Sequence, residues 1–270
     1  MLLSEGRQIK QIYQPSQERP MHVVVFGSGS GTNLEALLRA QRELQTPDGR
    51  PLFEVKALFT DRQCRFHEIA ERERLPLIHH SFVRFFKNHD SDDYQDTEIR
   101  TAFDAQNVEL LEKCAKENNF NVDLIFLAGY MRLLYPPLLR HYAHKILNVH
   151  PADLTLKDEN GKRKYVGANA VFDALMNGET RTRSSVILID ENVDNGPILV
   201  SGPWLPYTEG HPVTFKRAAY HQDKQKTFSD WRACIKAVEL IAEGRVAIDE
   251  NQNVYLNNKP ADKGGYILEP

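Results

Sequence analysis

Short β-branched runs alternate with longer amphipathic stretches from residue 22 onward. This pattern predicts a first strand over His22–Phe26 and a first helix over Asn33–Glu43, where leucines recur on one helical face. A second strand is predicted over Val55–Phe59, after a polar turn that contains proline and glycine. Strands that alternate with helices in this way are typical of a parallel sheet covered by helices.

The alternation continues through the rest of the chain. It predicts helices over Arg65–Glu73, Thr97–Lys116, Ala168–Met176 and Tyr220–Glu243, strands over Leu75–Ile78, Val122–Leu127, Ile146–Val149 and Ser185–Ile189, and short strand-like pieces at Val246–Ile248 and Val254–Leu256. Several of these strands are almost continuously apolar, as expected when both faces of a sheet are covered. We therefore expect an α/β fold with an open, mostly parallel, Rossmann-like sheet and helices on both faces.

Three stretches fall outside this pattern. Residues 1–20 are polar and end at Pro20, so we expect an N-terminal extension ahead of a single domain over residues 21–270, not a part of its core. Residues 80–96 carry three phenylalanines followed by an acidic run, which favours a surface excursion with an aromatic anchor. Residues 154–165 are rich in charge and glycine, which predicts a solvated loop.

Composition and charge narrow the possible classes of protein. A chain of 270 residues, with 41% hydrophobic and 26% charged residues, can fold around a sizeable core. Its formal charge of -3 lacks the basic excess of nucleic-acid-binding proteins, so small molecules are the expected partners. The three cysteines are too few and too scattered for a disulfide framework or a metal site, and no apolar run is long enough to span a bilayer. We expect a cytoplasmic protein without a metal.

A glycine-rich loop, Gly27–Asn33, joins the first predicted strand to the first helix. Its backbone N–H groups and the helix N-terminus suit a phosphate, although such a turn can need glycine for its tight geometry alone. The rival function is a nucleotide-binding oxidoreductase, in which Asp61 would hold a ribose. The GxGxxG spacing is absent, because its last position falls on Thr32 or Leu34.

A second group of polar residues follows the later strands. Asn148 and His150 alternate by two at the end of a predicted strand, so both project from the same side of the carboxyl edge, where open α/β sheets bind ligands. Asp194 precedes a rigid Asn-Gly-Pro turn. Each feature alone could be structural: a satisfied polar pair at a strand end, and an acid that caps a turn.

Taken together and in order, these motifs resemble the folate-dependent formyltransferase family. Four segments carry the resemblance over about residues 22–250: "VVVFGSGSGTNLEALL", "DLIFLAGYMRLL", "ILNVHP" and "NVDNGPIL". The resemblance implies catalytic roles for Asn148, His150 and Asp194. It further implies a substrate-phosphate site at Gly29, Ser30, Gly31, Thr32 and Asn33, a folate pocket at Tyr130, Met131, Arg132, Leu133 and Leu134, and, by a loose alignment, a ribose contact at Asp230.

The implied reaction is formyl transfer from the co-substrate 10-formyltetrahydrofolate to the amine of glycinamide ribonucleotide, a step of purine synthesis. Attack of an amine on the formyl carbon creates an oxyanion, which an amide N–H of Asn148 and an imidazolium N–H of His150 can stabilise. Asp194, within reach of His150, would favour the charged imidazole. Transfer to another amine, such as an aminosugar nucleotide, and hydrolysis of the folate stay open, as does the choice between monomer and homodimer.

The chain departs from the family pattern in two places. The residues after His150 are changed, and a charged insertion over about Lys157–Lys164 replaces a short loop that helps to cover the substrate in the family. A family histidine near the catalytic aspartate is missing, because the strand that carries it in the family appears here as Arg183–Ile187. The amine acceptor is therefore less firmly predicted than the reaction type.

Overall fold

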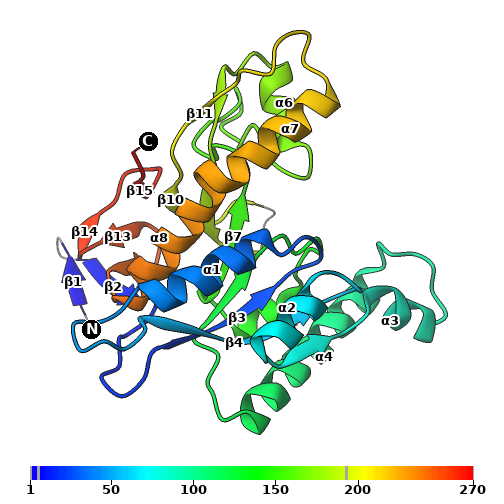
Figure 1. Cartoon of the computed structure of the whole chain (residues 1–270), viewed down its shortest axis with the longest axis vertical. Coiled ribbons are helices and arrows are strands. Elements are labelled where there is room, and N and C mark those ends of the chain that lie inside the picture. The colour runs from blue at the N-terminus through cyan, green and yellow to red at the C-terminus, as the bar shows by residue number, and fades with distance from the viewer. Residues whose placement is uncertain (1, 5–6, 192–193, 270) are drawn as a thin grey trace.

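The computed structural model describes residues 2–4, 7–191 and 194–269. An eight-stranded sheet forms its centre, with the strand order β15-β10-β9-β7-β6-β3-β4-β5 (Figure 1). The strands are β3 (Met21–Phe26), β4 (Phe53–Thr60), β5 (Leu77–His79), β6 (Leu124–Leu127), β7 (Ile146–His150), β9 (Ser185–Leu188), β10 (Ile198–Ser201) and β15 (Tyr266–Ile267). β9 runs antiparallel to both of its neighbours, and every other neighbouring pair is parallel. The expected open, mostly parallel sheet is confirmed.

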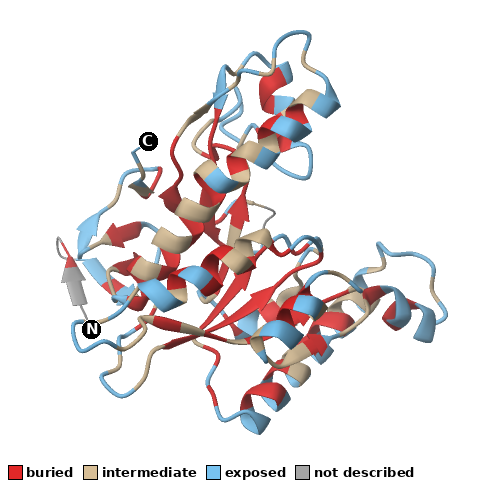
Figure 2. Cartoon of the chain, in the orientation of Figure 1, coloured by how far each residue is buried: buried red, intermediate tan, exposed pale blue. Residues whose placement is uncertain are grey.

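Helices cover both faces of this sheet. One face packs against α1 (Thr32–Glu43), α2 (Phe66–Glu73) and α8 (Trp231–Ala242), and the other against α4 (Thr97–Glu117) and α5 (Pro136–His141). Successive side chains of β3 enter the two cores in turn, because neighbouring residues of a strand point to opposite faces. The buried positions accordingly follow the sheet and the inner sides of its helices (Figure 2).

Two helical regions differ from the predicted ones. The helix expected over Tyr220–Glu243 is divided into α7 (Phe215–Gln225), a π-helical turn η1 (Lys226–Asp230) and α8. Within residues 80–96, the unpredicted helix α3 (Phe82–Asn88) buries its three phenylalanines against Phe103, which confirms the aromatic anchor. The remaining helix, α6 (Ala170–Met176), lies near its predicted position.

The N-terminal segment forms part of a second sheet. β1 (Leu2–Ser4) and β2 (Arg7–Gln11) join β12 (Val246–Asp249), β13 (Val254–Leu256) and β14 (Lys259–Pro260) in an antiparallel sheet of order β1-β2-β12-β13-β14. Ile9 is only 2% exposed and packs against Ala247 and Tyr255. The expectation that residues 1–20 stay outside the core is therefore wrong, because the C-terminal strands offer β2 a partner. The domain boundary at residue 20 stays a prediction.

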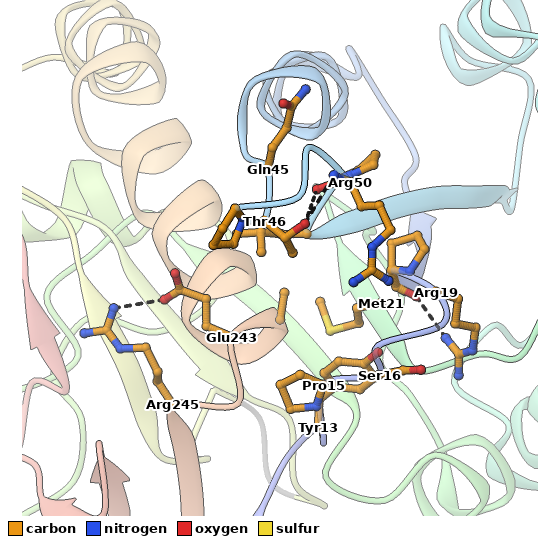
Figure 3. A pocket seen from close by; sticks show the side chains of 15 residues that line it. Tyr13, Pro15, Ser16, Arg19, Met21, Gln45, Thr46, Arg50, Glu243 and Arg245 are labelled. Atoms are coloured by element: carbon orange, nitrogen blue, oxygen red, sulfur yellow. Dashed lines mark hydrogen bonds and ion pairs between the residues drawn. The ribbon is translucent and has the colours of Figure 1, made fainter.

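The chain after β2 also packs on the domain. Tyr13, which is buried in the main core, lines a cavity of about 420 Å³ together with Arg19, Arg50 and Arg245 (Figure 3).

A third, two-stranded sheet consists of β8 (Arg181–Thr182) and β11 (Leu205–Pro206), which pair antiparallel. Among the described helices, none has both the length and the apolar character that a membrane span requires.

Candidate active site

The candidate site lies where the parallel part of the central sheet meets its antiparallel part. β7 pairs in parallel with β6 and antiparallel with β9. Asn148 and His150 lie near its carboxyl end, and Asp194 lies in the connection between β9 and β10. β9 runs antiparallel to β7 and ends opposite Leu147, so the connection leaves β9 near the amino end of β7 and folds back along it to bring Asp194 to His150.

The three polar side chains converge there. Asp194 accepts a hydrogen bond from Asn148 Nδ2 at 3.3 Å through Oδ1, and its Oδ2 lies 3.4 Å from His150 Nδ1. The side chains of His150 and Asp194 are only 5% and 11% exposed. One carboxylate therefore links the amide and the imidazole, in a place where water screens their charges little. The structure brings the predicted trio together, and the catalytic roles stay a prediction.

The other ring nitrogen of His150 fixes the position of a proton. His150 Nε2 lies 2.9 Å from the carbonyl oxygen of Tyr165, and a carbonyl oxygen can only accept, so Nε2 carries the hydrogen. Nδ1 is then the nitrogen that faces Asp194. Tyr165 and Leu154 are 2% and 1% exposed, so the prediction of a solvated loop over residues 154–165 is wrong at both ends of the segment.

A cleft of about 810 Å³ opens beside this trio. All the residues that the sequence assigned to the site line it: Gly29, Ser30, Gly31, Thr32, Asn33, Tyr130, Met131, Arg132, Leu133, Leu134, Asn148, His150, Asp194 and Asp230. Three segments far apart in the sequence, the glycine loop, the loop after β6 and the ends of β7 and β9, therefore share one cavity. Its size lies within the range of small-molecule binding sites.

The glycine loop leads directly into α1. Gly31 occupies the N-cap position with φ of 68°, a conformation that favours glycine, and no described side chain caps the helix. The first N–H groups of α1 therefore have no side-chain acceptor at the end of the cleft. Nearby, Asn33 Oδ1 is buried without a hydrogen-bond partner among the described residues. This end of the cleft has the properties of an anion site.

Asp61 does not take the role that an oxidoreductase would need. Its carboxylate is fully buried, accepts a hydrogen bond from Ser28 Oγ at 2.5 Å, and pairs with Arg62 at 3.0 Å and Arg132 at 2.7 Å. These donors and this burial leave it unavailable to a ribose hydroxyl, and it is absent from the described lining of the cleft. Asp61 therefore cannot act as the ribose-binding acid that a dinucleotide-binding site would need.

The loop after β6 presents apolar side chains to the cleft. Met131 and Leu133 are 62% and 52% exposed, whereas Tyr130 is buried with its ring edge against Phe26. Arg132 differs, because its guanidinium pairs with Asp61 and lies 4.0 Å from the centre of the Phe82 ring. The expected folate contact of Arg132 is thus left to its backbone.

Asp230 lies in η1 at the same cleft, and it is not a surface acid. It is 6% exposed and accepts a hydrogen bond from Ser184 Oγ. Burial raises the pKa of Asp230 above its ordinary value, while the hydrogen bond from Ser184 opposes that rise. A ribose contact by Asp230 stays a prediction.

Several residues at the site were not predicted from the sequence. Gln222 and Lys226 line the cleft from α7 and η1, and η1 contacts α1, which carries the glycine loop. Arg163 and Gly167 contact the turn that carries Asp194. Lys226 stands in a mixed run of charges that is typical of any solvated helix face, so only its place in the fold distinguishes it.

The match to known proteins agrees with this fold. The family described as Formyl transferase matches residues 21–204, which is more than half of the chain. The chain belongs to this formyltransferase family.

Individual relatives in this family are similar to the chain over most of its length. The chain is 32% identical to a phosphoribosylglycinamide formyltransferase of Mycobacterium tuberculosis over 71% of its own length and 74% of that protein. It is 28% identical to the phosphoribosylglycinamide formyltransferase of Escherichia coli, over 92% of this chain and all of that one. The solved structure of glycinamide ribonucleotide transformylase 1 from Symbiobacterium toebii superposes with a TM-score of 0.66 and 29% identity, covering 89% of this chain and 95% of that one.

Proposed function

We propose that this enzyme transfers the formyl group of 10-formyltetrahydrofolate to the amine of glycinamide ribonucleotide. The observation that carries the proposal is the single cleft in which an anion site, the Asn148–His150–Asp194 trio and an apolar loop lie in reach of one another. A phosphate suits the N-terminus of α1, with Lys226 on the same cleft as a cation. The relatives named for this activity support the choice of acceptor.

The trio suits each stage of the transfer. When the amine attacks the formyl carbon, the second N–H of Asn148 Nδ2 and a proton on His150 Nδ1 can stabilise the oxyanion. The carbon–nitrogen bond to the folate then breaks. One proton leaves the attacking nitrogen and one reaches the departing folate nitrogen, so the reaction needs a group that relays protons and gains none. His150 Nδ1, together with Asp194, can serve as this relay. Nε2 cannot, because it donates its hydrogen to the carbonyl oxygen of Tyr165.

The folate pocket is proposed at Tyr130–Leu134, where the exposed apolar side chains of Met131 and Leu133 lie at the cleft. The described residues contain no group of three or more His, Cys, Asp and Glu side chains placed to hold a metal. A cytoplasmic location and a monomeric or homodimeric state stay predictions.

The experiment is a competition between acceptors. The enzyme is incubated with 10-formyltetrahydrofolate and glycinamide ribonucleotide, an aminosugar nucleotide or no acceptor, while the absorbance of the released folate is followed. Of the three incubations, we expect rapid turnover only in the one with glycinamide ribonucleotide. The variant His150→Ala should lose this turnover and still bind the folate. Turnover only with the aminosugar nucleotide, or at equal rates without an acceptor, would contradict the proposal.

A further inference from the structure

The turn that carries Asp194 has a tight and uncommon backbone conformation. Asp194 has φ of 49°, in the left-handed region, which costs a residue with a side chain about 1 kcal/mol. At Gly196, an added Cβ would lie 1.7 Å from the carbonyl oxygen of Leu188. The turn therefore fits against β9 in one arrangement, and contacts from other segments must hold Asp194 in it.

One side chain supplies two such contacts. Arg163 Nη1 donates to the carbonyl oxygen of Asp194, and Arg163 Nη2 donates to the carbonyl oxygen of Gly196 at 2.8 Å. The two branches of the guanidinium thus hold carbonyls two residues apart, on either side of Asn195. A planar fork with fixed donor directions suits this task, whereas a lysine could reach one carbonyl at a time.

Arg163 is itself held in place by the charged insertion. Lys157 and Arg163 form an antiparallel bridge, and Asp158 Oδ1 accepts the N–H groups of Asn160 and Lys162, each at 2.9 Å. These contacts make residues 157–163 a closed hairpin with Arg163 at its base. The insertion is an ordered part of the site.

The hairpin is also fixed relative to His150. Tyr165 follows it, is 2% exposed and donates from its hydroxyl to Glu179 at 2.9 Å, while its carbonyl oxygen accepts from His150. Gly167 then donates its N–H to Asp194 Oδ2 at 3.3 Å. One short segment therefore contacts both the imidazole and the carboxylate of the trio.

The charge of Arg163 strengthens these bonds. The side chain is partly buried, and its burial lowers the pKa of the guanidinium while Asp194 and Asp190 oppose this. An arginine keeps its charge under such conditions, and hydrogen bonds from a charged donor are roughly twice as strong as neutral ones.

We propose that Arg163 is a positioning residue for formyl transfer, which holds the Asp194 turn so that the carboxylate stays within reach of His150. The inference rests on the proposed function. Arg163 is not among the described residues that line the cleft, so it acts through Asp194 and not on a substrate.

The test compares Arg163→Ala with Lys162→Ala, which removes the same charge from an exposed neighbour in the same hairpin. We expect kcat of Arg163→Ala to fall about 10- to 100-fold, because a small misplacement of a catalytic group has an effect of that order. The KM values for folate and acceptor should stay unchanged, since Arg163 contacts neither proposed pocket. Arg163→Lys should lose less activity, and added guanidinium should restore part of the activity of Arg163→Ala. Lys162→Ala should match the wild type.

The outcomes separate the inference from the proposed function. If the wild type transfers formyl groups and His150→Ala does not, an unchanged kcat in Arg163→Ala overturns the inference alone. An equal loss in Lys162→Ala, or a rise in both KM values at constant kcat, also overturns it. If the wild type transfers no formyl group to glycinamide ribonucleotide, the proposed function fails. Thermal unfolding is measured for each variant. If Arg163→Ala is unfolded at the assay temperature, the test rests on Arg163→Lys, and a wild-type kcat in that variant overturns the inference.

Discussion

The loop after β6 and the turn that carries Asp194 form two walls of one cleft, and they are held in different ways. Beneath the loop lie two buried carboxylates from distant parts of the chain. Asp61 pairs with Arg132, and Asp104 of α4 accepts the N–H of Tyr135 at 2.5 Å. The turn is held by a guanidinium and a backbone N–H from one neighbouring segment, the stretch that includes Arg163 and Gly167.

The position of the carboxylate decides what each wall contributes. Below the loop the acids are removed from solvent and from the cleft, so their charges act on stability and on the shape of the proposed folate pocket. In the turn the acid lies at the cleft beside His150, so its charge is available to the reaction. Changes to the turn should therefore alter turnover, and changes beneath the loop should alter stability and its dependence on pH.

The largest expected effect comes from the turn. Asp194→Asn keeps the shape of the side chain and removes the negative charge that lies 3.4 Å from His150 Nδ1. Because positioned acid–base groups contribute about 10²- to 10⁴-fold, we expect kcat to fall by that order, with a free energy of unfolding close to that of the wild type. Steady-state kinetics and urea unfolding measure the two quantities. Asp92→Asn, an exposed acid in residues 80–96, is the charge control and should change neither. A kcat of Asp194→Asn near the wild-type value would remove the distinction between the walls.

A smaller effect, of a different kind, is expected beneath the loop. Asp61→Asn leaves Arg132 and Arg62 without their charged partner in a place where the carboxylate was fully buried. We expect the free energy of unfolding to fall by about 2–3 kcal/mol, the scale of a lost charged hydrogen bond. Ser28 Oγ joins Asp61 to the N–H of Met131, so the KM for the folate should also rise, and more than kcat falls.

Asp48→Asn is the matched control for Asp61→Asn, because Asp48 forms an exposed pair with Arg50 and neither is among the described residues that line the cleft. It should leave unfolding and kinetics unchanged. A drop in kcat for Asp61→Asn with unchanged stability would assign Asp61 to the chemistry and contradict the comparison.

The smallest effect concerns pH. Burial raises the pKa of Asp104 to about 7, and an unfolded aspartate titrates near 3.8. Between these values the folded protein keeps a proton that the unfolded chain has lost, so stability falls as pH rises and the loss is complete above the folded pKa. From pH 6 to pH 8 the wild type should lose about 1.4 kcal/mol relative to Asp104→Asn, which cannot titrate. Urea unfolding of both proteins at the two pH values measures this, and a constant difference between them would refute it.

The two walls also differ in how far the sequence predicted them. The apolar loop was predicted because its segment resembles one of the formyltransferase family, and Asn148 and His150 were singled out because strand alternation places them on a common side. The supports of both walls were missed. Asp61 was considered for a ribose, Asp104 was one acid in a long charged helix, and Arg163 lay in a segment expected to be solvated. In each case the local pattern of the residue is that of an ordinary surface position.

The sequence alone determined the alternation of strands and helices, the carboxyl edge where polar side chains gather, and the types of residue available for formyl transfer, because these depend on periodicity and short motifs. Tertiary structure alone decided that β9 runs antiparallel to β7 and that the connection after β9 folds back to place Asp194 beside His150. It also decided that β2 joins β12 and that an exposed-looking hairpin places Arg163 on the Asp194 turn. Contacts between segments far apart in the chain have no period in the sequence, since they form only when the sheet assembles.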